Sequence, residues 1–155
     1  RSDIIDASLN SFDINQITEI YKKSIVLNKY INKEIGINIV SSYKRASNIL
    51  SHELNNKELE ISNSIDPVLF KSEYEKNLYK KIHELRKYFT SINRDENYDL
   101  TLKNLADSKK VIFEFFDNVK VNDEDKTIKK NRLELLHLFC RTFDNYILFS
   151  SIESL

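Results

Sequence analysis

Apolar residues recur at intervals of three and four along most of the chain, which is the spacing of one face of an α-helix. In the last such segment, Ile128, Leu135 and Phe139 follow this spacing. The apolar stripes are wide enough to be buried on several sides, so we expect the helices to pack as one bundle. Five or six helices are predicted in this way, at about residues 2–10, 14–35, 37–54, 66–92, 98–116 and 126–149.

Residues that start or end helices stand between these segments. Ser2, Asp13 and the pair Asp66-Pro67 are typical of helix starts. Gly36 is expected just after the second helix, in the left-handed conformation that ends many helices. Polar loops are expected at 55–64, 93–97 and 117–125. Sheets and long loops need many turn residues, and this chain has 1 Gly and 1 Pro. The fold class is therefore predicted to be all-α, a bundle of five to six helices.

The composition favours one globular domain over residues 1–155. Lys and Arg together number 24, as do Asp and Glu, so net charge indicates no partner. Cys140 is the single cysteine and cannot form an internal disulfide, and we expect it to be a buried thiol. No apolar run approaches the roughly 20 residues that cross a membrane. These features favour the cytoplasm, and a first residue other than Met predicts a fragment of a longer chain.

The residue types that perform catalysis or bind metals are not arranged for either task. The three histidines, His52, His83 and His137, lie in three different predicted helices. Glu134 and His137 form one Glu-x-x-His pair, but a metal site in a helical bundle needs two such pairs facing inward. We interpret this pair as part of a solvated helix face. We expect no catalytic residues and no metal site, so the chain is predicted to act through its surface.

The helix predicted at 37–54 carries a basic face. Ile39, Tyr43, Ala46 and Leu50 share its apolar side, and the opposite side carries Ser41, Lys44, Arg45, Asn48 and His52. No acidic residue lies between Glu34 and Glu53, so we expect this face to lack an internal countercharge. Cations and hydrogen-bonding groups together suit a phosphate backbone or an exposed base. An ordinary solvated face is the alternative interpretation.

Arg132 falls on the apolar stripe of the last helix, in line with Ile128 and Leu135. A buried guanidinium needs a carboxylate partner, because an unpaired buried charge is costly. Asp117, at the end of the preceding helix, is the predicted partner. We therefore expect the pair Asp117 and Arg132 to be structural and to hold the loop 117–125 in place.

Two sequence motifs resemble a known family. The first is Phe-Phe-Asp-Asn-Val-Lys-Val at 115–121, followed by Asn-Arg-Leu at 131–133 and by Leu135-Leu136. The second is Tyr-Lys-Arg-Ala-Ser-Asn-Ile-Leu at 43–50. Together they resemble the C-terminal end of the β subunit of bacterial heterotetrameric glycyl-tRNA synthetase, and more distantly arginyl-tRNA synthetases. The resemblance implies a helical anticodon-binding domain of the type named after the sequence Asp-Ala-Leu-Arg.

The same resemblance implies a role in aminoacylation. The chain would bind the anticodon arm of tRNA(Gly), while the α subunit of the glycine–tRNA ligase carries glycine activation. ATP and Mg²⁺ would be used by the whole enzyme, and this fragment would bind no cofactor. Lys44, Arg45 and Asn48 are the first candidates for tRNA contact, and His52 and Arg141 are weaker ones. The alternative is a helical protein–protein interaction module without RNA binding, whose aromatic residues line a groove for a partner helix.

Overall fold

The computed structural model describes residues 14–55, 60–91, 97–146 and 149. These residues form helices and loops without a strand, which confirms the all-α fold class. The short helix predicted at 2–10 and the cap predicted at Asp13 lie outside the described residues. The elements are α2 (Ile14–Tyr30), α3 (Glu34–Leu54), the 3₁₀ turn η1 (Pro67–Leu69), α4 (Glu73–Ser91), α5 (Tyr98–Ala106), α6 (Ser108–Asn118) and α7 (Lys126–Asp144).

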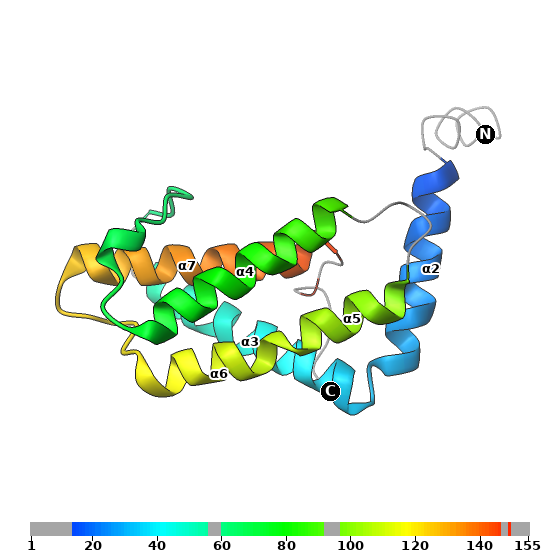
Figure 1. Ribbon diagram of the computed structural model, residues 1–155, viewed down its shortest axis with the longest axis horizontal. Helices are drawn as coiled ribbons and strands as arrows, with labels where there is room; N and C mark the ends of the chain where they lie inside the picture. Colours follow the sequence, from blue (N-terminus) through cyan, green and yellow to red (C-terminus); the bar gives the residue numbers. More distant parts are fainter. Residues whose placement is uncertain (1–13, 56–59, 92–96, 147–148, 150–155) are drawn as a thin grey trace.

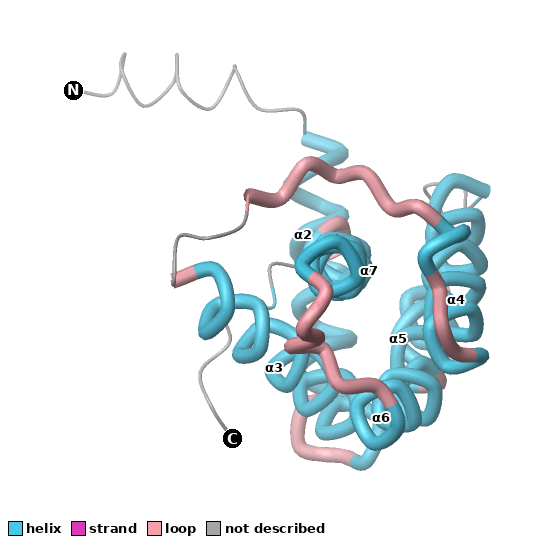
Figure 2. The backbone as a smooth tube through the Cα atoms, turned by 90° about the vertical axis from the view of Figure 1, so that its left-hand side faces the viewer, coloured by secondary structure: helices cyan, strands magenta, loops and turns pink. Residues whose placement is uncertain are grey.

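Helix α7 runs through the bundle and packs against both α3 and α4 (Figure 1). Helices α5 and α6 follow one another along the opposite side and contact α3, and α6 also contacts α4. The loop that precedes α4 passes over α7 (Figure 2). The side chains of Phe115, Phe139 and Phe143 are fully buried at the centre of this arrangement. The apolar stripes of α3 to α7 therefore meet in one core, as the helical spacing predicts. The stripe predicted for α2 is only partly buried, because Ile17, Ile20, Tyr21 and Ile25 stay exposed.

Gly36 lies within the first turn of α3 and its φ is not positive, so the prediction of a left-handed glycine that ends α2 is wrong. The reason for a glycine here is the close approach of the chain that leaves α2. A Cβ atom at this position would collide with the carbonyl oxygen of Tyr30 and would lie 2.6 Å from the Cα atom of Ile31. The absence of a side chain thus permits the tight turn between the two helices.

The pair Asp66-Pro67 starts only the 3₁₀ turn, and α4 begins later than predicted, at Glu73. The side chain of Asp66 accepts a hydrogen bond from the backbone N–H of Val68, as a cap should. The chain then becomes extended at Phe70. Ser72 and Glu75 form a capping box, in which Glu75 Oε2 accepts from the Ser72 N–H and Ser72 Oγ accepts from the Glu75 N–H. The long helix α4 therefore begins at this capping box and not at Asp66.

Two further helix boundaries differ from the predictions. The segment 98–116 is divided into α5 and α6 at Asp107, next to Ser108, whose hydroxyl donates to the Leu105 carbonyl. Such local bonds compete with the regular helix pattern. Helix α7 ends at Asp144, and Phe149 returns to the core as a buried ring whose backbone N–H donates to Asp144 Oδ1. A periodic pattern does not distinguish this return from a continued helix.

Candidate nucleic-acid interface

The two sides of α3 differ as the sequence predicts. Ile39, Tyr43, Ala46 and Leu50 are buried against the bundle. On the other side, Asn48 and His52 are exposed, and Ser41, Lys44 and Arg45 are partly exposed. The structure therefore places four of the five predicted tRNA-contact residues, Lys44, Arg45, Asn48 and His52, on one helix. Arg141 lies elsewhere, on α7.

Arg45 has a countercharge, which corrects the expectation that this face has none. Its Nη2 atom lies 3.3 Å from Oδ1 of Asp117, at the end of α6. Its guanidinium also stands over the rings of Phe113 and Phe116, at 4.9 Å and 4.6 Å from their centroids. Phe115 is fully buried, whereas Phe116 is only partly buried and supports the guanidinium. Because the ion pair is exposed, it contributes little to stability, and a phosphate could compete for Arg45.

His52 stands next to an acidic residue at the end of the same helix. Its Nδ1 atom lies 3.5 Å from Oε1 of Glu53, whose side chain is buried. The main partner of Glu53 is Lys129 of α7, with Nζ 2.6 Å from Oε2. The hydrogen bond from Lys129 holds the pKa of Glu53 below its usual value. Lys129 therefore offsets the negative charge that stands beside His52.

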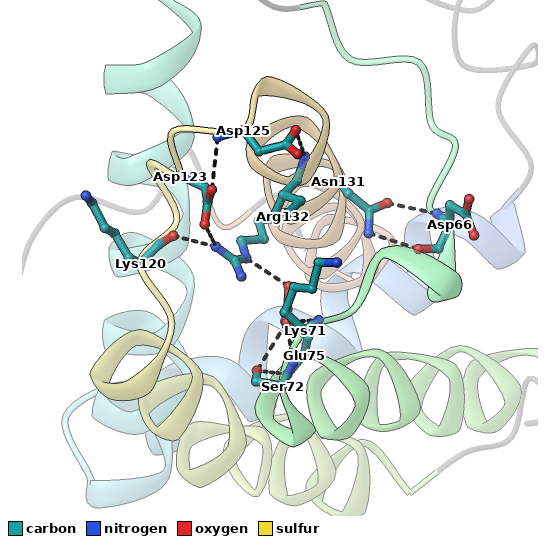
Figure 3. Close-up of polar contacts among 10 residues, drawn as sticks. Asp66, Lys71, Ser72, Glu75, Lys120, Asp123, Asp125, Asn131 and Arg132 are labelled. Carbon is teal, nitrogen blue, oxygen red and sulfur yellow. Dashed lines mark hydrogen bonds and ion pairs between the residues drawn. The ribbon is translucent and has the colours of Figure 1, made fainter.

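The buried Arg132 is not paired with Asp117, which contacts Arg45 instead. Arg132 Nε donates to Oε1 of the fully buried Glu75 at 2.8 Å (Figure 3). Its Nη1 donates to Asp123 Oδ2 at 2.7 Å and to the Lys120 carbonyl at 2.9 Å. The prediction of a carboxylate partner named the wrong residue, because Asp117 still belongs to α6 and Glu75 comes from a distant part of the chain. Arg132 nevertheless contacts the loop 117–125, through Lys120 and Asp123.

Asn131 connects the same helix to the loop before α4. Its side chain exchanges two hydrogen bonds with the backbone of Asp66 (Figure 3). One turn further on, Glu134 accepts bonds from the backbone N–H and the hydroxyl of Ser62. Glu134 is buried, so the interpretation of Glu134 and His137 as a solvated face is wrong for Glu134. Both contacts hold the segment 62–66 along α7.

Arg141 is exposed and lines a groove between α4 and α7, beside that segment. Arg86 of α4 lines the same groove, together with Asn63. Sequence reasoning did not find Arg86, because only the packing of α4 on α7 brings it near Arg141. The described residues thus carry two separate cationic surfaces, one on the outer face of α3 and one in this groove.

The single cysteine does not line this groove. Cys140 is buried as predicted, and burial raises the pKa of its thiol to about 12. Within the described ranges, no three His, Cys, Asp or Glu side chains are placed to hold a metal ion. None of the helices in the same ranges has the length and apolar content that crossing a membrane requires.

Comparison with known proteins agrees with this all-helical architecture. The family model described as the DALR anticodon binding domain matches residues 39–149, which contain most of α3 and all of α4 to α7. The chain therefore belongs to the DALR anticodon-binding domain family.

More particular similarity points to one kind of synthetase subunit. The chain is 32% identical over 148 residues to the glycine–tRNA ligase beta subunit of Rickettsia typhi, covering 90% of this chain and 21% of that protein. It is 34% identical over 141 residues to the same subunit of Rickettsia felis, covering 91% of this chain and 20% of that protein. It is 29% identical over 136 residues to the subunit of Clostridioides difficile, covering 88% of this chain and 19% of that protein. The chain thus spans about a fifth of the length of these relatives.

Proposed function

We propose that this chain binds the anticodon arm of tRNA(Gly) as part of the β subunit of a glycine–tRNA ligase. The observation that carries the proposal is the family match over the helical bundle, together with similarity to three glycine–tRNA ligase beta subunits. Anticodon bases are unstacked, so hydrogen bonds and stacking can recognise them, while cations contact the nearby phosphates. The outer face of α3 offers these groups.

We expect the protein in the cytoplasm and the chemistry of aminoacylation outside this chain. We assign glycine activation with ATP and Mg²⁺ to the α subunit of the same ligase. Mg²⁺ prefers oxygen ligands from carboxylates and phosphates. The described part of this chain offers no matching group of three such side chains. The role left to the chain is to position the tRNA.

On α3, we assign the phosphate and base contacts first to Lys44, Arg45 and Asn48. Asn48 lies between Arg45 and His52 on this helix and is exposed. Its side-chain amide can both donate and accept hydrogen bonds. Arg45 would exchange Asp117 for a phosphate, while the rings of Phe113 and Phe116 keep its guanidinium in place. His52 is the outer limit of this surface, because Glu53 lies beside it.

A matched pair of substitutions tests this face. Arg45→Gln should weaken tRNA(Gly) binding and reduce the dependence of affinity on salt by about one phosphate contact. Asp117→Asn removes the competing carboxylate and should instead strengthen binding. Filter binding at several salt concentrations measures both effects. If both variants bind tRNA(Gly) with the affinity and the salt dependence of the wild-type chain, Arg45 is not part of the interface.

One observation favours a second candidate function, contact with another polypeptide. Helix α2 carries apolar side chains that are 45% to 67% exposed, namely Ile17, Ile20, Tyr21 and Ile25. Such a surface is typical of a protein interface. A gel mobility shift with tRNA(Gly) and an unrelated tRNA separates the two functions. Binding of neither tRNA, or equal binding of both, would favour the protein-interaction module.

A further inference from the structure

The groove between α4 and α7 has two adjoining parts, each of about 330 Å³, which share Asn63, Arg86 and Leu138. Its α4 side carries Tyr79, His83 and Arg86, at helical spacing. Its α7 side carries Glu134, His137, Leu138 and Arg141. The volume falls within the range of small-ligand sites. The segment 63–65 borders the groove, and the bonds of Ser62 and Asp66 to α7 hold this segment at both ends.

Two guanidinium groups in this groove suit an anion. Arg86 and Arg141 are both exposed, and within the described residues neither forms an ion pair. Arg141 makes one long hydrogen bond, 3.4 Å, to Oδ1 of Asn63. Guanidinium groups bind phosphate oxygens through two parallel donors. Together the two arginines can bind one phosphate group between α4 and α7.

Next to the arginines lies a surface for a flat ring. The rings of Tyr79 and His83 meet edge to face, with centroids 4.3 Å apart, and the imidazole of His83 is exposed. Aromatic and imidazole rings of this kind stack on unpaired bases. His137 lies on the opposite side of the groove. Its pKa is lowered mainly by burial and to a smaller extent by the positive charge of Arg141. A neutral imidazole offers one donor and one acceptor to a base.

Glu134 contributes an acceptor that has no partner. Its Oε1 atom accepts two hydrogen bonds from Ser62, while its buried Oε2 atom accepts none in the described structure. An unsatisfied buried acceptor costs free energy, which a donor from a bound ligand would recover. A carboxylate accepts well from the amino group of cytosine and repels the carboxylates of an acidic peptide. This residue therefore favours a nucleobase over an acidic protein segment.

We propose that this groove binds one unstacked nucleotide of single-stranded RNA. Its phosphate lies between Arg86 and Arg141, its base stacks on the exposed imidazole of His83, which packs edge to face against Tyr79, and its amino group donates to Glu134. Since Oε2 is covered in the absence of ligand, neighbouring side chains shift when the base enters. The proposal rests on the proposed RNA-binding function, but it concerns a surface separate from the outer face of α3.

The double substitution Arg86→Gln with Arg141→Gln tests the phosphate site. The probe is a fluorescein-labelled hexamer of cytidylate, and its affinity for the chain is measured by fluorescence anisotropy. The double variant should bind at least about tenfold more weakly, which corresponds to about 1.4 kcal/mol. Lys87→Gln is the matched control, because Lys87 is exposed next to Arg86 but does not line the groove. It should change affinity by less than about threefold. Circular dichroism verifies that each variant folds.

Glu134→Gln tests the base contact. The amide oxygen can still accept from Ser62, while the other position changes from an acceptor to a donor. The wild-type chain should prefer the cytidylate hexamer over a uridylate hexamer by about tenfold, and the variant should lose or invert this preference. An unchanged preference would remove Glu134 from the site.

The remaining outcomes distinguish this inference from the proposed function. If the wild-type chain binds tRNA(Gly) but the groove variants bind the hexamers as it does, the groove inference is wrong and the proposed function stands. If the wild-type chain binds neither tRNA(Gly) nor the hexamers, both fail. If a hexaglutamate peptide binds more tightly than the hexamers, and the arginine substitutions weaken it, the groove is a protein-binding site instead.

Discussion

At the scale of single residues, the bundle depends on one buried guanidinium. Arg132 connects the start of α4, through Glu75, with the loop 117–125, through Asp123 and the Lys120 carbonyl. Arg132→Met should lower the free energy of unfolding by about 3–5 kcal/mol, since Glu75 would remain buried without its cationic partner. Urea denaturation measures this loss.

Double-mutant cycles identify the partner. Arg132→Met combined with Glu75→Gln should show a coupling of about 0.5–3 kcal/mol. The control cycle with Asp117→Asn should show less than about 0.5 kcal/mol, because Asp117 contacts Arg45 instead. Stronger coupling to Asp117 than to Glu75 would contradict the observed network.

The ion pair between Glu53 and Lys129 predicts a dependence of stability on pH. The pKa of Glu53 is lower in the folded chain than in the unfolded one, chiefly because of the hydrogen bond from Lys129. Its stabilising effect is therefore complete above the unfolded pKa of about 4.3 and is lost as pH falls through the folded pKa. Lys129→Met should lower the free energy of unfolding by about 1–3 kcal/mol at neutral pH. At a pH below both pKa values the loss should nearly disappear.

Lys126→Met is the control for this prediction, because Lys126 is exposed in the same first turn of α7. It should have little effect at either pH. An equal loss from Lys129→Met at both pH values would mean that the aliphatic part of Lys129, and not its charge, supports the fold.

At the scale of elements, the turn between α2 and α3 depends on Gly36. In an ordinary helix, replacing glycine by alanine stabilises by about 1 kcal/mol. Here the added Cβ would overlap the backbone of Tyr30 and Ile31, so Gly36→Ala should destabilise the chain by about 1–3 kcal/mol. Thermal unfolding measures the change, and Ser51→Ala at an exposed position of α3 is the control. A more stable Gly36→Ala variant would disprove the close approach.

At the scale of the whole molecule, helical spacing and helix-start residues were enough to predict the fold class and most of the core. They do not distinguish between two successive start signals, so they predict that α4 begins at Asp66, where the structure has only a 3₁₀ turn. The sequence also does not distinguish a glycine that permits close backbone contact, as Gly36 does, from one that ends a helix. Each of these features depends on neighbours that only the folded chain brings together.

The candidate interface was predictable to a similar degree. The outward position of Lys44 and Asn48 follows from the periodicity of α3 alone. The contact of Arg45 with Asp117 and the approach of Arg86 to Arg141 do not follow from periodicity, because they join residues 72 and 55 positions apart. Such pairs depend on how α3 packs against α6 and how α4 packs against α7.

In the proposed function, the outer face of α3 recognises an anticodon. The most direct measurement compares the affinity of the chain for tRNA(Gly) with its affinity for the same tRNA in which only the anticodon nucleotides are replaced. Loss of the hydrogen bonds that read the bases should weaken binding by at least about tenfold, while the phosphate contacts remain. Equal affinity for both tRNAs would show that the chain does not read the anticodon.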